Sequence, residues 1–402
     1  MRRNRPHRRI TFFCSDLANN NVVRLYPIVC VLARHHEVEV IGPLFGDAEL
    51  FAPYRAELRC HAVRAPAKAV MKARAWRALT HELSRLAQGD VLYAFKPLLA
   101  SYGSAIAAAI RMHAPLVLDI EDWEACEYHQ MRWRARWTPR WPWRVFRDQS
   151  NPYSTRLLEL LTFLADRRVV ATTFLQRRYG GTKVVQGVDC EEFEPGRPPR
   201  AEARRALGLE KNDKVILFSG TASPHKGVSD LVDAIRALEG RRLKLALVGP
   251  DTEEARRLST NASDVVVFFG PRPHSHMPVF LAAADLVCLP QRDEPYARAQ
   301  IPAKVFEAMA MGCPVVATDV SDLGEILNGC GLVVPPSDTA SLARAIDGLI
   351  SNQDLQTTLG HRARERCVKL YSWDAMEAPL DEVVRMAGTG HWRRPWRWLR
   401  PL

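Results

Sequence analysis

Two charged residues interrupt an otherwise apolar stretch from Pro302 to Met311, which the spacing predicts to be a helix that begins at Pro302. Lys304 lies in the first predicted turn and Glu307 follows three residues later, so both side chains project from one face. A cation in the first turn opposes the helix dipole unless an anion is bound there. The spacing allows two arrangements: a plain ion pair, or a site in which Lys304 meets a phosphate and Glu307 accepts hydrogen bonds from sugar hydroxyls.

A second cationic loop follows the buried strand predicted at residues 214–220. It ends in Lys226 and Gly227, and a helix is predicted to start at Val228. A strand, a loop of small residues with a lysine, and a helix N-terminus form a phosphate-binding arrangement. The spacing differs from that of a Walker loop. From spacing alone, a solvated lysine is the alternative.

Acidic residues mark the end of another predicted strand, residues 115–120. Glu121 and Asp122 follow it directly, with Trp123 next to them. Open α/β sheets bind ligands at the carboxyl ends of their strands, although an acidic residue there can also cap a helix. We expect Glu121 and Asp122 to face the cleft and contact a ligand there. Asn21, in the asparagine-rich loop after the first strand, is a third candidate for this edge.

Strands and helices alternate through both halves of the chain, which predicts an α/β architecture of two Rossmann-like, doubly wound parallel-sheet domains that face a central cleft. The predicted domains are residues 1–193, residues 194–370, and a C-terminal crossover helix with a tail at residues 371–402. The linker is predicted near residues 194–199, which are rich in proline and glycine.

Composition limits the remaining function classes. The 402 residues are 47% hydrophobic and 25% charged, which are ordinary globular values. The nine cysteines include no C-x-x-C pair, so free thiols in a reducing compartment are expected. No apolar run approaches the ~20 residues of a membrane span. His274 and His276 lack further ligands at metal spacing, so we expect capping or surface roles for them and no metal or cofactor.

Arginine and tryptophan cluster in two segments, residues 132–147 and 391–400, which together hold seven of the ten tryptophans. The net charge of the chain is +11. Aromatic rings beside guanidinium groups suit the interface of an anionic membrane. A solvated charged loop is the alternative, and nucleic acid is the weaker rival because no nucleic-acid-binding fold pattern accompanies these segments.

The run from Glu307 to Ala317, read as E-A-M-A-x-G-x-P-V-V-A, resembles the signature of the family-4 retaining glycosyltransferases, which have the GT-B fold. The resemblance implies that Glu307 holds the ribose hydroxyls of a nucleotide-sugar donor. It also implies that Lys226 binds the donor diphosphate. Two positions depart from the family pattern: Ala299 stands where a second glutamate is common, and Thr221 stands where an arginine is usual.

The resemblance extends the expected site. It implies catalytic roles for Lys226, Lys304 and Glu307, and the ammonium groups of the two lysines would stabilise the leaving diphosphate without a metal. Donor contacts are expected from these three residues and from Gly220, Thr221 and Arg272. Glu294 is a displaced substitute for the missing glutamate. On the acceptor side, Glu121, Asp122 and Asn21 are expected to contact the acceptor or the transferred sugar.

The function implied is sugar transfer, with retention of configuration, from a nucleotide-diphosphate sugar to a saccharide or lipid-linked acceptor. The expected location is the cytoplasm, peripheral to the inner face of the cell membrane. Two alternatives stay open: a nucleotide-sugar epimerase on the same fold, and a catalytically degenerate, membrane-associated binding protein.

Overall fold

The computed structural model describes residues 7–20, 22–51, 59–131, 151–210, 212–238 and 241–389. Asn21 and the arginine- and tryptophan-rich segments at 132–147 and 391–400 lie outside the described residues, so their predicted roles stay predictions. The chain divides into two compact units. The first comprises Met1–Val185 and Met376–Leu402, and the second comprises Gln186–Ala375.

The first unit contains a seven-stranded sheet in the order β3-β2-β1-β4-β5-β6-β7, and every neighbouring pair is parallel. Its strands are β1 (Arg9–Phe13), β2 (Glu37–Phe45), β3 (Cys60–Ala65), β4 (Val91–Phe95), β5 (Leu116–Ile120), β6 (Arg167–Val170) and β7 (Thr182–Lys183). All residues of β4 and β5 are buried. This is the pattern of a parallel sheet covered on both faces.

Helices connect these strands. They are α1 (Val22–Ala33), α2 (Ala73–Leu86), α3 (Ser104–Met112), α4 (Cys126–Gln130), α7 (Pro152–Leu160) and α8 (Thr173–Tyr179). A short π-helical turn, Leu99–Gly103, directly precedes α3. Asn151 caps α7, because its side chain accepts hydrogen bonds from the backbone N–H groups of Tyr153 and Ser154.

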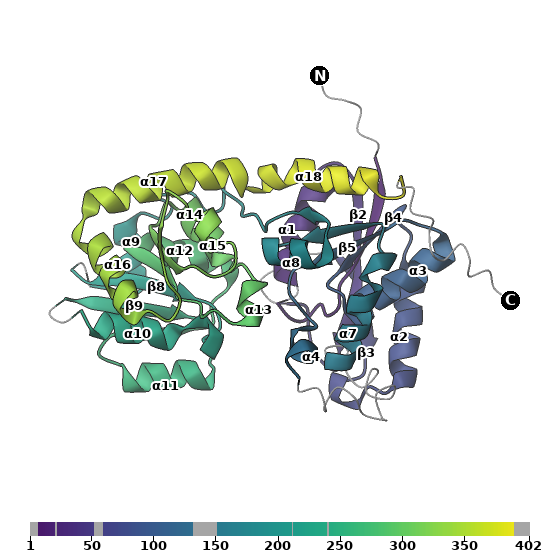
Figure 1. Ribbon diagram of the computed structural model, residues 1–402, viewed down its shortest axis with the longest axis horizontal. Helices are drawn as coiled ribbons and strands as arrows, with labels where there is room; N and C mark the ends of the chain where they lie inside the picture. The colour runs from purple at the N-terminus through teal and green to yellow at the C-terminus, as the bar shows by residue number, and fades with distance from the viewer. Residues whose placement is uncertain are drawn as a thin grey trace, which may run out of the picture. The chain divides into compact units, whose positions relative to one another are not determined.

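The second unit repeats the plan with a six-stranded parallel sheet in the order β10-β9-β8-β11-β12-β13. Its strands are β8 (Lys214–Ser219), β9 (Leu243–Val248), β10 (Val266–Gly270), β11 (Leu286–Leu289), β12 (Val315–Thr318) and β13 (Leu332–Val334). In Figure 1, α10 (Val228–Arg236) and α11 (Glu253–Asn261) lie on one side of β8 and β9, and α12 (Met277–Ala283) lies on the other.

The remaining helices of this unit follow one another towards the C-terminus. They are α9 (Arg200–Ala206), α13 (Pro295–Arg298), α14 (Lys304–Ala310), α15 (Leu323–Ile326), α16 (Thr339–Ser351), α17 (Gln353–Leu370) and α18 (Trp373–Met386), which continues into the first unit. Ser372 caps α18, because its hydroxyl accepts a hydrogen bond from the Ala375 N–H at 3.2 Å.

Strand order reverses once in each sheet. The reversal lies between β1 and β4 in the first unit and between β8 and β11 in the second. Loops at the carboxyl ends of the strands beside such a reversal diverge and leave room for a ligand. The loops after β1 and β4, and those after β8 and β11, are therefore the expected ligand sites.

Two points of the sequence analysis need correction. The helix expected from Pro302 begins two residues later, at Lys304, because Pro302 and Ala303 form a turn whose carbonyls accept from Val305 and Phe306. The strand β3 was missed, because it is a partly exposed edge strand with His61 and Arg64 in its sequence. All nine cysteines are free, as expected. Within the described residues, no helix is long and apolar enough to cross a membrane.

Candidate functional site

The loop after β8 is held against the loop after β11 by a close backbone approach at Gly227. This glycine has φ +66°, and a Cβ there would lie 1.9 Å from the Pro290 carbonyl oxygen. Only glycine fits both the left-handed conformation and the space. The approach fixes where Lys226, the preceding residue, can reach.

Lys226 lies at the edge that the sequence predicts. Its Nζ donates to Gln300 Oε1 at 2.6 Å, and Gln300 belongs to the segment that leads into α14. Arg292, in the loop after β11, forms a bidentate ion pair with Asp230 in the first turn of α10, at 2.5 and 2.9 Å. Side-chain hydrogen bonds, in addition to the close backbone approach at Gly227, thus connect the segments that follow β8 and β11.

Glu307 is buried within α14, which is apolar elsewhere. Val305, Phe306 and Ala308 pack in the core, while the Glu307 side chain is 7% exposed. Lys304, the first residue of the helix, donates from Nζ to Glu307 Oε1 at 3.0 Å. Burial alone would raise the pKa of Glu307, but the Lys304 ammonium and the His274 ring lower it to about 2. The carboxylate is therefore ionised at neutral pH.

His274 is the second partner of Glu307, and the capping or surface role expected for it is wrong. Its Nε2 lies 3.1 Å from Glu307 Oε1, from the turn that follows β10. Its ring packs against the buried Phe193 ring, with centroids 5.5 Å apart. The sequence carries no local signal for this contact, because His274 and Glu307 are 33 residues apart.

Other residues expected in the donor site have fewer contacts. Thr221 and Arg272 are exposed, and neither makes a side-chain hydrogen bond or ion pair with another described residue. Gly220 has φ +138°, and nothing within 4 Å would meet a Cβ there. Glu294 is exposed at the start of α13, whereas Ala299 is fully buried. These residues leave Lys226, Lys304 and Glu307 as the core of the candidate donor site.

The first unit carries an acidic cluster at the carboxyl ends of β4 and β5. Lys96, directly after β4, pairs with Asp122, with Glu124 at 3.2 Å and with Glu121 at 3.6 Å. Lys96 adopts φ +65°. Burial raises the pKa of Glu121 to about 7, although Lys96 opposes the shift. Glu121 and Asp122 therefore lie at the predicted edge, and Lys96 completes a cluster that carries more negative than positive charge.

Asp119, the acidic residue nearest to this cluster, has a structural role. It is fully buried in β5 and pairs with the equally buried Arg24 at 3.0 Å, while Tyr93 donates to it at 3.0 Å. Arg24 also donates to the Val184 carbonyl at 2.9 Å. This pair ties α1 to the sheet beneath the acidic cluster.

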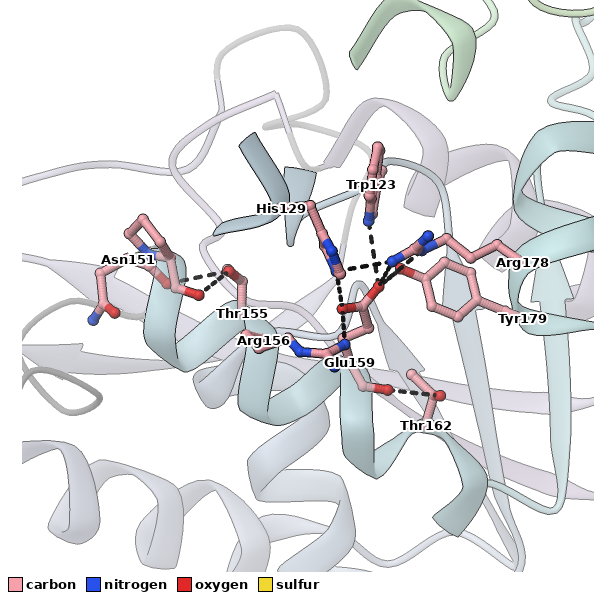
Figure 2. A network of polar contacts seen from close by, with 10 residues as sticks. Trp123, His129, Asn151, Thr155, Arg156, Glu159, Thr162, Arg178 and Tyr179 are labelled. Atoms are coloured by element: carbon pink, nitrogen blue, oxygen red, sulfur yellow. Dashed lines mark hydrogen bonds and ion pairs between the residues drawn. The ribbon is translucent and has the colours of Figure 1, made fainter. Parts of the chain in front are cut away.

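A second network orients the loop that carries the acidic cluster (Figure 2). Its centre is Glu159 on α7, whose side chain is 6% exposed. Trp123, within the acidic loop, donates to Glu159 at 3.3 Å, and the Arg178 guanidinium lies 4.3 Å from the Trp123 ring centroid. Arg156, Arg178 and Tyr179 also donate to Glu159, at 2.6–2.9 Å, and the Nε2 atom of His129 lies 2.7 Å from its carboxylate. The acidic loop is thereby fixed to α4, α7 and α8.

The described residues contain no group of three His, Cys, Asp or Glu side chains placed to hold a metal ion. The acidic cluster instead surrounds an ammonium group. Its carboxylates are hydrogen-bond acceptors for a ligand's hydroxyl groups or for a cation.

Sequence comparisons match part of the chain, and the family model lies within the second unit. Residues 199–366 match the family model described as "Glycosyl transferases group 1". A D-inositol 3-phosphate glycosyltransferase of Nocardia farcinica is 30% identical over 241 residues, which are 54% of this chain and 52% of the relative. One from Mycobacterium marinum is 32% identical over 198 residues, 47% of this chain and 41% of the relative. The chain thus spans about half the length of the curated relatives it matches.

Similar solved structures cover both units. The Anabaena protein Alr3699/HepE, solved with UDP-glucose, has a TM-score of 0.73 at 18% identity, over 94% of this chain and 100% of that one. Sucrose-phosphate synthase of Thermosynechococcus elongatus has a TM-score of 0.69 at 19% identity, over 94% and 99% of the two chains. At this identity the likeness establishes the fold, which is GT-B. The chain therefore has the GT-B fold, and its residues 199–366 carry the sequence pattern of the group 1 glycosyl transferases.

Proposed function

We propose that this chain transfers a sugar from a nucleotide-diphosphate donor to an acceptor hydroxyl, with retention of configuration at the anomeric carbon. Two contacts beside the β8–β11 reversal support the proposal: the ion pair of Glu307 with Lys304, and the hydrogen bond of Lys226 to the segment that leads into the same helix. Glu307 and Lys304 are in contact there, and Lys226 binds Gln300 four residues before Lys304. Sugar hydroxyls bind carboxylates and diphosphates bind ammonium groups, so one nucleotide sugar matches both kinds of group.

Each group has a role in this proposal. Glu307 accepts hydrogen bonds from the ribose hydroxyls, and Lys226 contacts the diphosphate beside the N-terminus of the nine-residue helix α10. The positive groups stabilise the negative charge that develops on the leaving diphosphate. An oxygen of the leaving phosphate takes the acceptor's proton, so the reaction needs no protein base and no metal.

The acceptor is proposed to be a saccharide or a lipid-linked saccharide. Glu121, Asp122 and Glu124 around Lys96 offer acceptor atoms for hydroxyl groups and disfavour a phosphate at that edge. The curated relatives are named for inositol 3-phosphate, which makes this compound a direct test of the charge argument. We propose a cytoplasmic location at the inner face of the membrane, on the composition of residues 132–147 and 391–400.

Thermal-shift measurements with a panel of nucleotide sugars, UDP-glucose first, test donor binding, because a donor that binds the native state raises the melting temperature. Glu307→Ala and Lys226→Ala should each abolish the shift. Lys369→Ala, a change at an exposed lysine of α17, should leave it unchanged. A shift that survives both site substitutions would contradict the proposal.

Product analysis separates transfer from the alternatives, neither of which the names of the relatives favour. We expect donor consumption only when an acceptor is present. Conversion of the donor to its epimer without an acceptor would instead indicate an epimerase.

Membrane binding needs a separate test. Co-sedimentation of the protein with anionic liposomes should fall when residues 391–402 are deleted and the arginines at 132–147 are neutralised. Unchanged co-sedimentation would count against membrane binding by these segments.

A further inference from the structure

The two oxygens of Glu307 have different surroundings. Oε1 lies 3.0 Å from Lys304 Nζ and 3.1 Å from His274 Nε2. Oε2 is buried and accepts no hydrogen bond from the described residues. A buried carboxylate oxygen without a donor costs free energy, so its place at the ligand edge indicates that a ligand supplies the donor.

The two partners of Oε1 differ in rigidity. Lys304 lies one turn before Glu307 on the same helix, and its flexible side chain can follow the carboxylate as it rotates. The imidazole of His274 comes from a different segment, has two rotatable bonds, and packs against Phe193. The Phe193 backbone is fixed in turn, because its carbonyl accepts from Arg364 at 2.9 Å. His274 is therefore the partner that defines the orientation of the carboxylate.

We propose that His274 is a positioning residue for donor recognition: by holding Glu307 Oε1 it directs Oε2 toward a ribose hydroxyl, so that the site distinguishes ribonucleotides from deoxyribonucleotides. This inference rests on the proposed function, because it needs a nucleotide at the β8–β11 reversal. His274 itself does not touch the nucleotide in this arrangement. Its effect passes through Glu307.

The chain offers a matched set of variants. His274→Ala removes the ring. His274→Gln places an amide nitrogen near the position of Nε2 and restores a donor to Oε1, whereas the amide of His274→Asn corresponds to Nδ1 and falls short. His276→Ala changes an exposed histidine of the same turn and is the control.

The experiment measures dissociation constants by calorimetry for ADP, GDP and UDP and for their 2′-deoxy forms. For the nucleotide that binds, the wild type should prefer the ribose form by about tenfold or more, the effect of one hydrogen bond to a charged acceptor. Glu307→Ala should bring the ratio close to one. His274→Ala and His274→Asn should reduce it to about threefold or less, while His274→Gln and His276→Ala keep most of it.

Two failures are distinguishable. If wild-type protein binds none of these nucleotides, the proposed function fails and the inference falls with it. If the wild type shows the preference and Glu307→Ala loses it, but His274→Ala keeps it, only the inference about His274 is overturned. It is also overturned if His274→Ala weakens the ribose and deoxyribose forms equally and His274→Gln rescues neither. In steady-state assays His274→Ala should raise KM for the donor and leave kcat nearly unchanged, because the ribose is remote from the bonds that change.

Discussion

Replacing Glu159 by glutamine tests how the first unit holds its acidic loop. The substitution keeps the size of the side chain but removes the charge on which the Trp123, His129, Arg156, Arg178 and Tyr179 donors converge (Figure 2). A glutamine oxygen can accept only some of these bonds, and its NH₂ group would face donors. We therefore expect a large loss of stability at neutral pH.

The magnitude follows from the pKa of Glu159. Burial would raise it, but hydrogen bonds from His129, Arg156, Arg178 and Tyr179 lower it from 4.5 to about 2. Each unit of pKa shift corresponds to roughly 1.4 kcal/mol, so the ionised carboxylate stabilises the fold by at most ~3.5 kcal/mol. The Arg156 and Arg178 side chains are 30% and 29% exposed, so solvent screening reduces this to ~2 kcal/mol.

Urea unfolding at several pH values is the assay. The pKa of Glu159 is lower in the folded state, so its stabilisation is complete above about pH 4.5 and is lost as the pH falls toward 2. At pH 7, Glu159→Gln should lower the free energy of unfolding by ~2 kcal/mol, which moves the urea midpoint down by roughly 1 M. At pH 3 the difference between variant and wild type should be much smaller.

The matched control is Glu127→Gln on α4, which removes an exposed carboxylate near the same network. It should change the free energy of unfolding by less than ~0.5 kcal/mol at every pH. Equal midpoints for Glu159→Gln and wild type at pH 7 would refute the reasoning. A difference that stays constant from pH 7 to pH 3 would also refute it, because the loss would then not depend on ionisation.

Three further substitutions test other parts of the structure. Gly227→Ala should destabilise the protein by more than ~2 kcal/mol in urea unfolding and abolish nucleotide binding. The control is Gly208→Ala, which has the same φ of +66° but open space around the added Cβ, and it should cost only ~1 kcal/mol. Burial raises the pKa of Glu121 to about 7, so ionising this carboxyl costs stability as the pH rises from 4.5 through 7. Glu121→Gln should therefore stabilise the protein by ~1–2 kcal/mol at pH 8 and have little effect at pH 4. Asp285→Asn should cost ~3 kcal/mol or more in the same assay, because it leaves the buried Arg204 without its carboxylate partner at 2.8 Å.

Local pattern was enough to predict the parts of the fold that depend on short-range spacing. The three-residue separation of Lys304 and Glu307 predicted their common face, and the ion pair between them is the simpler of the two arrangements considered. The alternation of strands and helices predicted two parallel sheets, because apolar runs of this length fit strands covered on both faces. The ends of elements were less accurate, as the start of α14 shows.

Contacts between distant segments could not be predicted in this way. His274 meets Glu307 across 33 residues, and Arg292 meets Asp230 across 62, because the strand order brings their loops to one edge. The order of strands in a sheet cannot be predicted from the spacing of residues along the chain. Lys96 is different, since a lysine directly after five buried strand residues is a visible signal of a cation at the ligand edge. Lys96 was not among the predicted site residues, which at this edge were the acidic residues after the next strand.

Two arrangements were considered for Lys304: an ion pair with Glu307 and a contact with a phosphate. The two contacts at Glu307 Oε1 explain how Lys304 can form the first without a nucleotide and the second with one. Without a nucleotide, Lys304 and His274 share one oxygen of the carboxylate, and the pKa of Glu307 is held near 2. If the Lys304 ammonium turns to a donor phosphate, the histidine still holds Oε1, so Glu307 stays oriented while the lysine changes partner. A lysine alone could not do both, because releasing the carboxylate would leave it free to rotate. We therefore expect Lys304→Met to weaken diphosphate binding but to preserve the ribose preference, the opposite of His274→Ala. Loss of both properties in Lys304→Met would show that the lysine, and not the histidine, orients the carboxylate.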